Sequence, residues 1–369
     1  MNTRSSGLTC IATLVGIFAG SIYAAAPDYA VNDSHFHLTN YVQEGIDIRD
    51  LLKLMGDKVG RVALFGIPLQ QSWSYRNTGD FAPTYYLQTD SPLYYYSFTD
   101  AYIAMQYLSL SAKDRARFDP MITGFNPSDM YAADHIKRVL KTFPGVFSGI
   151  GEFTVHKEFV SSKVAGEVAS LTDPALDRIL DFAGDAGLVA IMHNDIDVPY
   201  PKSDQEPHEL KQLSDLFRRH PKTQIIWAHC GVGRIVRPLK DQAALLERAL
   251  SDPALNHVAI DISWSETAKY IVASPESIER AAQMINRFPD RFVFGTDEVA
   301  PANQDAYLRV YEMYQPLFAK LTPEASLKLR KGNYERLFDT ARTRVRAWEK
   351  ANVRQQQDGT TARTSPASD

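Results

Sequence analysis

The chain has 369 residues, of which 44% are hydrophobic and 23% are charged, and this composition excludes a disordered or fibrous protein. A net charge of −4 and a pI near 6.2 argue against a nucleic-acid partner, because such proteins carry a basic surface stripe that this sequence lacks outside its tail. We therefore expect a globular protein that acts on a small molecule.

Residues 1–26 are predicted to form an export signal peptide. A short basic start precedes the uncharged, mostly apolar residues 8–23, and the alanines at 24–26 suit cleavage. A single-span membrane anchor is the alternative, but the apolar stretch is short and rich in Gly, Ser and Thr. Cleavage predicts a periplasmic or secreted protein without stable membrane anchoring. It would leave Cys230 as the one cysteine of the mature chain, so the fold cannot depend on an internal disulfide.

Eight short segments rich in β-branched and apolar residues are predicted strands. They comprise residues 28–35, 60–66, 120–124, 146–152, 188–193, 224–229, 257–263 and 291–297. Longer amphipathic stretches separate them, and this alternation is typical of a parallel sheet. The regular spacing of the later strands predicts a single (β/α)8 barrel. A doubly wound open sheet is the alternative, but no Gly-rich phosphate loop follows the first strand.

Several helices have ends that the sequence marks clearly. Asp173 is the predicted N-cap of one helix, with Pro174 in its first turn and Gly187 as its stop. Its expected buried stripe consists of Leu176, Ile179, Leu180 and Ala183. Ser274-Pro275 and Thr322-Pro323 repeat this start signal.

Helices over residues 305–320 and 323–350 are expected to complete the barrel. From residue 351 the sequence loses its apolar periodicity and gains Gln, Ser, Thr and Pro, which predicts a disordered tail to residue 369. We therefore expect one folded domain over residues 27–350.

An aromatic-rich insertion follows the second predicted strand. Residues 73–102 hold seven of the 18 tyrosines and belong to a connection that leaves from the catalytic face of the barrel. The segment is either a lid that lines a partly aromatic substrate or a local core that holds a long loop together. Arg76 is a candidate partner for a substrate carboxylate.

Ionisable residues stand at the ends of five predicted strands. They are His35, His37, Glu152, His193, His229 and Asp297. In a (β/α)8 barrel the active site forms at the carboxyl ends of the strands, so these side chains should converge. Four histidines and two carboxylates on one rim would leave unpaired buried polar groups unless they shared a cation.

Five motifs in this order resemble the amidohydrolase superfamily, and within it the amidohydrolase-related branch of metal-dependent barrel hydrolases and decarboxylases. They are DSHFH, MHND, WAHCG, FGTDE and, in the closing helix at residues 331–338, KGNYERLF. The resemblance implies that His35, His37 and Asp297 bind a divalent metal, with His193 as a further ligand. It also implies that His229 contacts the substrate or a second ion, and that Asp297 handles the proton of a metal-bound water.

Glu152 leaves the metal count open between one ion and two. Many superfamily members have a carboxylated lysine at the end of the fourth strand, where this chain has GIGE. Glu152 is expected to bridge two ions, bind one ion or carry a proton, and an ion pair with Lys157 is the structural alternative. His156 lies in the loop that should follow and is a weaker candidate. His135, His208, His220 and His257 have no position at the rim and are interpreted as ordinary residues.

These residue types predict hydrolytic chemistry. Imidazole and carboxylate ligands suit zinc or manganese, and an open position on such an ion lowers the pKa of bound water from about 16 towards about 7. Asp297 would take the proton of that water, and His229 would stabilise the developing oxyanion. Small amides, lactones and other esters fit this scheme.

Two other functions stay open at the level of sequence. One is the non-oxidative decarboxylation of an aromatic or unsaturated carboxylic acid at the same metal site. The other is an exported binding protein without turnover, which would leave Asp297 unexplained. The sequence specifies neither the substrate nor the oligomeric state, so a homo-oligomer is also an open expectation.

Overall fold

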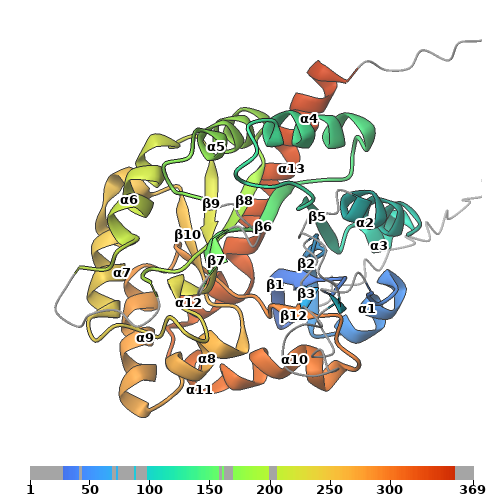
Figure 1. The fold of residues 1–369 in the computed structure, drawn as a ribbon. Helices are drawn as coiled ribbons and strands as arrows, with labels where there is room; N and C mark the ends of the chain where they lie inside the picture. Colours follow the sequence, from blue (N-terminus) through green and yellow to red (C-terminus); the bar gives the residue numbers. More distant parts are fainter. Residues whose placement is uncertain are drawn as a thin grey trace, which may run out of the picture.

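A curled parallel sheet lies at the centre of the protein, and helices surround it (Figure 1). The computed structural model describes residues 28–40, 44–68, 98–157, 169–198 and 206–353, together with three isolated pairs of residues in short strands. Within these residues nine strands run parallel: β1 (Val31–His37), β2 (Val59–Phe65), β5 (Phe118–Ile122), β6 (Gly149–Lys157), β8 (Val189–Asn194), β9 (Gln224–Trp227), β10 (Val258–Asp261), β11 (Phe292–Val293) and β12 (Glu298–Val299). The short pairs are β7 (Val160–Ser161), antiparallel to β6, and β3 (Ser72–Trp73) beside β4 (Leu87–Gln88).

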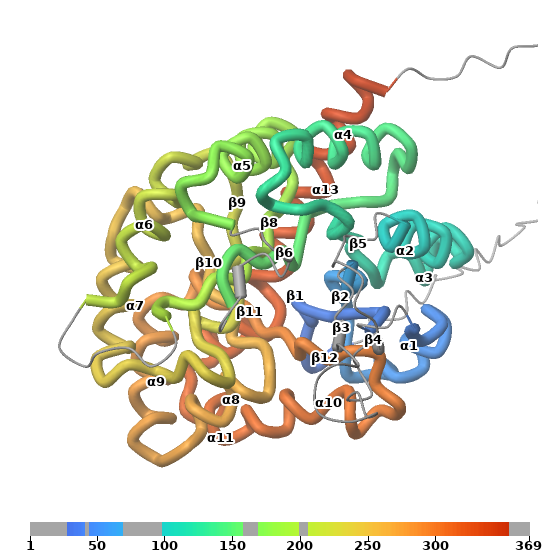
Figure 2. The backbone as a smooth tube through the Cα atoms, in the orientation of Figure 1, coloured from blue at the N-terminus to red at the C-terminus, as the bar shows by residue number. Residues whose placement is uncertain are grey.

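One stretch of chain reaches both edges of this sheet. β11 pairs with β10, whereas β12, only a few residues later, pairs with β1 (Figure 2). Between them the Ser34 amide donates to the Phe294 carbonyl at 3.0 Å, and the Asp297 amide donates to the His35 carbonyl at 2.7 Å. The strand order and these bonds are consistent with a (β/α)8 barrel.

The last predicted strand, residues 291–297, is two short strands instead of one. Asp297 has a φ of 52°, a left-handed conformation that interrupts the extended chain. Gly295 lies so close to β1 that a Cβ placed on it would stand 2.8 Å from the Cβ of His35. The closing segment therefore needs glycine at this point.

Most helices lie around the outside of the sheet, whereas the last helix runs behind the strands (Figure 1). The helices are α1 (Ile48–Met55), α2 (Phe98–Leu108), α3 (Ala112–Arg115), α4 (Ala132–Thr142), α5 (Pro174–Ala186), α6 (Leu210–Arg219), α7 (Gln242–Ser251), α8 (Ser265–Ile271), α9 (Pro275–Arg287), α10 (Gln304–Met313), α11 (Gln315–Phe318), α12 (Pro323–Leu327) and α13 (Asn333–Asn352). Among the described residues, no helix is both long enough and apolar enough to span a bilayer.

The predicted helix ends are confirmed for α5, α9 and α12. Asp173 accepts a hydrogen bond from the Ala175 amide at 2.8 Å, and Gly187 ends α5 with a φ of 82°. The side chains of Ser274 and Thr322 likewise cap α9 and α12.

The two C-terminal helices differ from their predicted courses. The helix predicted over residues 305–320 is divided between α10 and α11 at Tyr314, because Pro316 has no amide hydrogen to continue the ladder. The run predicted from residue 323 contains a wider turn over Lys328–Gly332 before α13 begins.

Two apolar clusters form the core. The larger one fills the space between the sheet and the outer helices. The smaller one lies inside the sheet and includes Val189 and Ile191, whereas the alternate residues Ala190 and Met192 face outward. Tyr334, Leu337, Phe338 and Ala341 of α13 belong to this inner cluster. Helix α13 therefore closes the amino-terminal end of the sheet and leaves the carboxyl end for a site.

Some predictions fall outside the described residues. They are the signal peptide at residues 1–26, all but the first three residues of the tail predicted over residues 351–369, and most of the aromatic-rich insertion, including Arg76. Helix α13 continues to Asn352, two residues into the predicted tail.

A buried carboxylate joins α13 to the sheet. Asp119 of β5 accepts hydrogen bonds from Arg61 Nη2 at 2.9 Å, from the Tyr334 hydroxyl at 2.7 Å and from Arg342 Nε at 2.5 Å. We expect Asp119→Ala to lower the free energy of unfolding by about 3 kcal/mol, because it leaves two guanidinium groups without their buried partner. Urea unfolding measures this loss.

The matched control is Asp339→Ala. Asp339 also binds Arg61, at 2.6 Å, but its side chain is 61% exposed. Its loss should cost about 0–1 kcal/mol. Equal small losses in the two variants would contradict the role assigned to Asp119.

Candidate metal centre

The structure brings together all six ionisable residues predicted for the rim. His35 and His37 come from β1, Glu152 from β6 and His193 from β8, whereas His229 and Asp297 lie just beyond strand ends. His37 Nε2 is 3.0 Å from Asp297 Oδ1, and His193 Nδ1 is 2.6 Å from Glu152 Oε1. The site therefore lies at the carboxyl end of the sheet, as expected for this architecture.

Four of these residues offer donor atoms to one common point. One ligand atom each from His35, Glu152, His229 and Asp297 lies within 4.8 Å of every other. His35 Nε2 is 3.3 Å from Asp297 Oδ1, and His229 Nε2 is 3.4 Å from Glu152 Oε1. Donors about 2.0–2.2 Å from one first-row cation would be separated by such distances.

Asp261 determines which nitrogen of His35 faces this point. The two residues are fully buried, and His35 Nδ1 lies 2.7 Å from Asp261 Oδ2. A carboxylate only accepts hydrogen bonds, so Nδ1 carries the proton and donates it. His35 Nε2 is left without a hydrogen-bond partner in a buried position. A carboxylate that orients a histidine in this way is typical of metal sites.

His229 is held in a similar manner. Its Nδ1 lies 2.9 Å from the Ser263 hydroxyl, and its buried Nε2 has no hydrogen-bond partner. Burial lowers the pKa of His229 below its ordinary value and so favours the neutral ring, which is the form that binds metals. The unpaired Nε2 atoms of His35 and His229 are the orphaned polar groups that a cation would satisfy.

His37 and His193 flank the four-donor group. His37 Nε2 is 3.8 Å from Glu152 Oε2 as well as close to Asp297. Both ring nitrogens of His193 face carboxylates, with Nε2 3.1 Å from Asp195 Oδ1. These positions are compatible with either direct binding or support of the group.

The carboxylates of the site are held in the ionised form. Burial alone would raise the pKa of Asp297, but the charge of His35 and the hydrogen bond of His37 outweigh it and hold the pKa well below its ordinary value. The same balance, with His193 as the chief partner, lowers the pKa of Glu152. Burial likewise opposes protonation of His35, but Asp297 and Asp261 hold its pKa well above the usual range. A bound cation would take the place of the imidazole protons.

Left-handed backbone turns place several rim side chains. The φ angles are 57° for His229, 77° for Trp264 and 52° for Asp297, values that residues other than glycine seldom adopt. Such conformations cost free energy and cluster at functional sites. The turn at His229 also ends β9 at Trp227, so the predicted strand to residue 229 is two residues too long.

His156 lies within a strand and not in a loop as predicted. β6 continues past Glu152 because residues 153–157 alternate between buried and half-buried and pair with β7 and β8. Glu152 contacts the rim histidines, and Lys157 Nζ lies 4.8 Å from the centre of the Trp264 ring.

Sequence reasoning missed three buried residues that support the site: Asp33, Asp261 and Ser263. Asp33 accepts hydrogen bonds from the Thr296 hydroxyl at 2.7 Å and from the His35 amide at 3.0 Å, so it ties β1 to the closing segment. Burial raises the pKa of Asp33 to about 6. An acidic residue inside an apolar run, as Asp261 is in VAIDI, was the available signal.

Removing the negative charge of Asp261 should weaken metal binding. We expect Asp261→Asn to lower the affinity for a divalent cation by about 10–100-fold, because the amide neither orients His35 nor raises its basicity as the carboxylate does. Metal titration of the chelator-treated protein, read by elemental analysis, measures this change.

Asp181→Asn is the matched control. Asp181 also bonds a histidine, His220 Nδ1 at 2.9 Å, but its side chain is 70% exposed and forms no part of the rim. Unchanged affinity in both variants would show that Asp261 does not support a metal site.

Comparisons with known proteins agree with this architecture. No curated protein matches the chain. An amidohydrolase structure from Burkholderia multivorans with bound zinc is 15% identical, covers 84% of this chain and 99% of its own, and has a TM-score of 0.52. A putative 2-pyrone-4,6-dicarboxylic acid hydrolase from Pseudomonas putida is 14% identical, with coverages of 84% and 98% and a TM-score of 0.50.

A third solved structure is 2,6-dihydroxybenzoate decarboxylase in complex with 2,6-dihydroxybenzoate. It is 16% identical, with coverages of 84% and 99% and a TM-score of 0.52. At such identities the three likenesses show the fold alone. The family described as Amidohydrolase matches residues 33–340, which is most of the chain. This match confirms the resemblance seen in the motifs: the chain belongs to the amidohydrolase family.

Proposed function

We propose that this protein is a metal-dependent hydrolase of a small amide, lactone or other ester. The observation that carries the proposal is the group of four donor atoms within 4.8 Å of one another, contributed by His35, Glu152, His229 and Asp297. Two of these donors are buried imidazole nitrogens without a hydrogen-bond partner. Nitrogen and carboxylate donors suit zinc first and manganese second.

The residues that would hold the ion are the four-donor group, with His37 and His193 beside it as further ligands or supports. A divalent cation bound here supplies Lewis acidity and lowers the pKa of an adjacent water from about 16 towards about 7. The second carboxylate, Glu152, lies within reach of His35, His37, His193 and His229. This central position leaves room for one ion or for two that share it.

Asp297 is the proposed proton carrier. Its carboxylate is ionised and 10% exposed, and the backbone bond from its amide to the His35 carbonyl fixes its place. It takes the proton of the attacking water at one oxygen and passes it to the leaving group. The neutral ring of His229 favours a ligand role for Nε2, and contact with the substrate oxyanion is the alternative.

An aromatic wall with two cations borders the site. The Trp264 ring lies 5.1 Å from that of His229, and Lys157 Nζ and the Arg234 guanidinium lie 4.8 Å and 5.4 Å from the Trp264 ring centre. Positive charges at the rim suit a substrate with a carboxylate. We therefore propose an anionic substrate.

The same wall favours one second candidate, the non-oxidative decarboxylation of an aromatic or unsaturated carboxylic acid. A carboxylate bound by Lys157 and Arg234 would lie beside Trp264, whose ring contacts that of His229. One protein of similar fold is a decarboxylase of 2,6-dihydroxybenzoate. The two reactions differ in their products, so an assay separates them.

Turnover should depend on Asp297. We expect Asp297→Asn to lower kcat per bound metal ion by about 100–10,000-fold, because the amide cannot accept a proton. The assay uses a panel of lactones, amides and carboxylated phenols, with metal content, ring opening and carbon dioxide all measured. Net addition of water supports the hydrolase, and carbon dioxide release supports the second candidate.

His208→Ala is the control for this assay. His208 is 62% exposed and bonds its neighbour Glu209, away from the rim, so its loss should leave turnover unchanged. A protein that holds no divalent metal and turns over none of the panel would refute the proposed function.

Lys157 should contribute to substrate binding. We expect Lys157→Met to raise KM for a carboxylated substrate by about tenfold and to leave KM for an uncharged analogue unchanged, because only the charge is removed. Lys211→Met, at a side chain that is 78% exposed on α6, is the matched control. Equal changes for both substrates would show that Lys157 acts through packing alone.

A further inference from the structure

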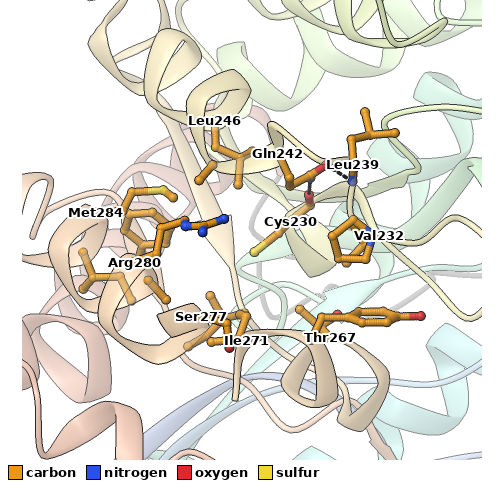
Figure 3. A pocket seen from close by; sticks show the side chains of 17 residues that line it. Cys230, Val232, Leu239, Gln242, Leu246, Thr267, Ile271, Ser277, Arg280 and Met284 are labelled. Atoms are coloured by element: carbon orange, nitrogen blue, oxygen red, sulfur yellow. Dashed lines mark hydrogen bonds between the residues drawn. The ribbon is translucent and has the colours of Figure 1, made fainter. Parts of the chain in front are cut away.

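A second cavity lies outside the sheet, between helices α7, α8 and α9 (Figure 3). Its volume is about 150 Å³, and apolar side chains such as Leu246, Ile271 and Met284 form most of its wall. An apolar cavity of this size accepts one benzene-sized ring. None of the four donor residues of the metal centre lines this cavity, although Cys230, next to His229, does.

An arginine without an acidic partner reaches over this cavity. Arg280 of α9 forms no ion pair or hydrogen bond with any residue that the structure describes. Figure 3 shows its guanidinium directed across the cavity towards Cys230 and Leu246. The nearby Glu279 contacts Lys320 instead, at 3.7 Å. Arg280 is exposed, and its guanidinium is available to an anion at the mouth of the cavity.

A buried hydroxyl in the same wall also lacks a partner. Thr267 of α8 is 1% exposed, and its Oγ1 has no hydrogen-bond partner within the described part of the chain. A buried polar group left in this state costs free energy. A ligand with a polar atom would satisfy it. Thr267 and Arg280 are thus two independent polar features in one apolar cavity.

The cavity is connected to the loop that carries His229. Gln242 Nε2 of α7 donates to the Cys230 carbonyl at 3.0 Å, and Cys230 Sγ lies 3.6 Å from the Asp261 carbonyl. Burial raises the pKa of the Cys230 thiol and so favours its protonated form. The thiol therefore lines the cavity and is not expected to act as a nucleophile.

We propose that this cavity binds a small aromatic carboxylic acid, with its ring in the apolar space and its carboxylate on the Arg280 guanidinium. Ring and charge together select this class: a neutral ring would leave Arg280 unpaired, and an inorganic anion would leave the apolar space empty. The site is distinct from the metal centre and goes beyond the proposed function.

Calorimetric titration of the full chain with benzoate tests this site, with benzyl alcohol as the uncharged probe. We expect Arg280→Ala to weaken benzoate binding at least tenfold and to leave benzyl alcohol binding unchanged. Arg287→Ala is the matched control, because Arg287 lies on the same helix and contacts Glu247 at 3.3 Å. Ala281→Phe, which fills the cavity, should abolish the binding of both probes.

The temperature of unfolding gives a second reading. Benzoate should raise this temperature in the unaltered protein and in Arg287→Ala, but not in Arg280→Ala. The proposal is overturned by an absence of benzoate binding, or by benzoate binding that Arg280→Ala leaves unchanged. Benzoate that binds only at the metal centre would be displaced by chelation and unaffected by Arg280→Ala, which would reject the cavity and leave the proposed function standing.

Discussion

The hydrogen bond between Asp261 and His35 is the constraint on which the site depends. His35 donates its Nδ1 proton to Asp261 in this bond, so its other ring nitrogen, Nε2, faces the site. His35 Nε2 lies 3.3 Å from Asp297 Oδ1, deep inside the protein. Ser263 holds the ring of His229 through a hydrogen bond with Nδ1. In their neutral forms, the two Nε2 atoms would present lone pairs to two ionised carboxylates, so a proton or a metal cation must lie between them. The proposed chemistry follows from a metal cation in that place.

The two ends of the sheet have different roles, because the amino-terminal end stabilises the fold and the carboxyl end carries the candidate site. At the amino-terminal end, Asp119 and the aromatic residues of α13 form a closed, paired network. At the carboxyl end, left-handed turns at His229 and Asp297 and unpaired nitrogens concentrate strain and unsatisfied groups. The paired network at the amino-terminal end stabilises the sheet, and the sheet fixes the backbone of His35 and Asp297. The carboxyl end can therefore hold strained residues and unpaired nitrogens in place.

Much of this organisation could be predicted from the sequence. The residues at the ends of successive strands converge because parallel strands end at one edge, so His35, Glu152 and Asp297 were identified from periodicity and placement. Asp261 and Ser263 were missed because they extend an apolar run that resembles any buried strand. The split of the last strand depends on the approach of Gly295 to β1, which is a tertiary contact that no local pattern records.

The segment from Phe292 to Val299 has two roles: it joins β10 to β1, and it positions Asp297 in the candidate site. Selection would therefore remove substitutions in this segment that harm either the fold or the candidate site. During divergence this joining segment would therefore stay almost unaltered, and new specificities would arise in parts of the chain that meet only one of these two demands.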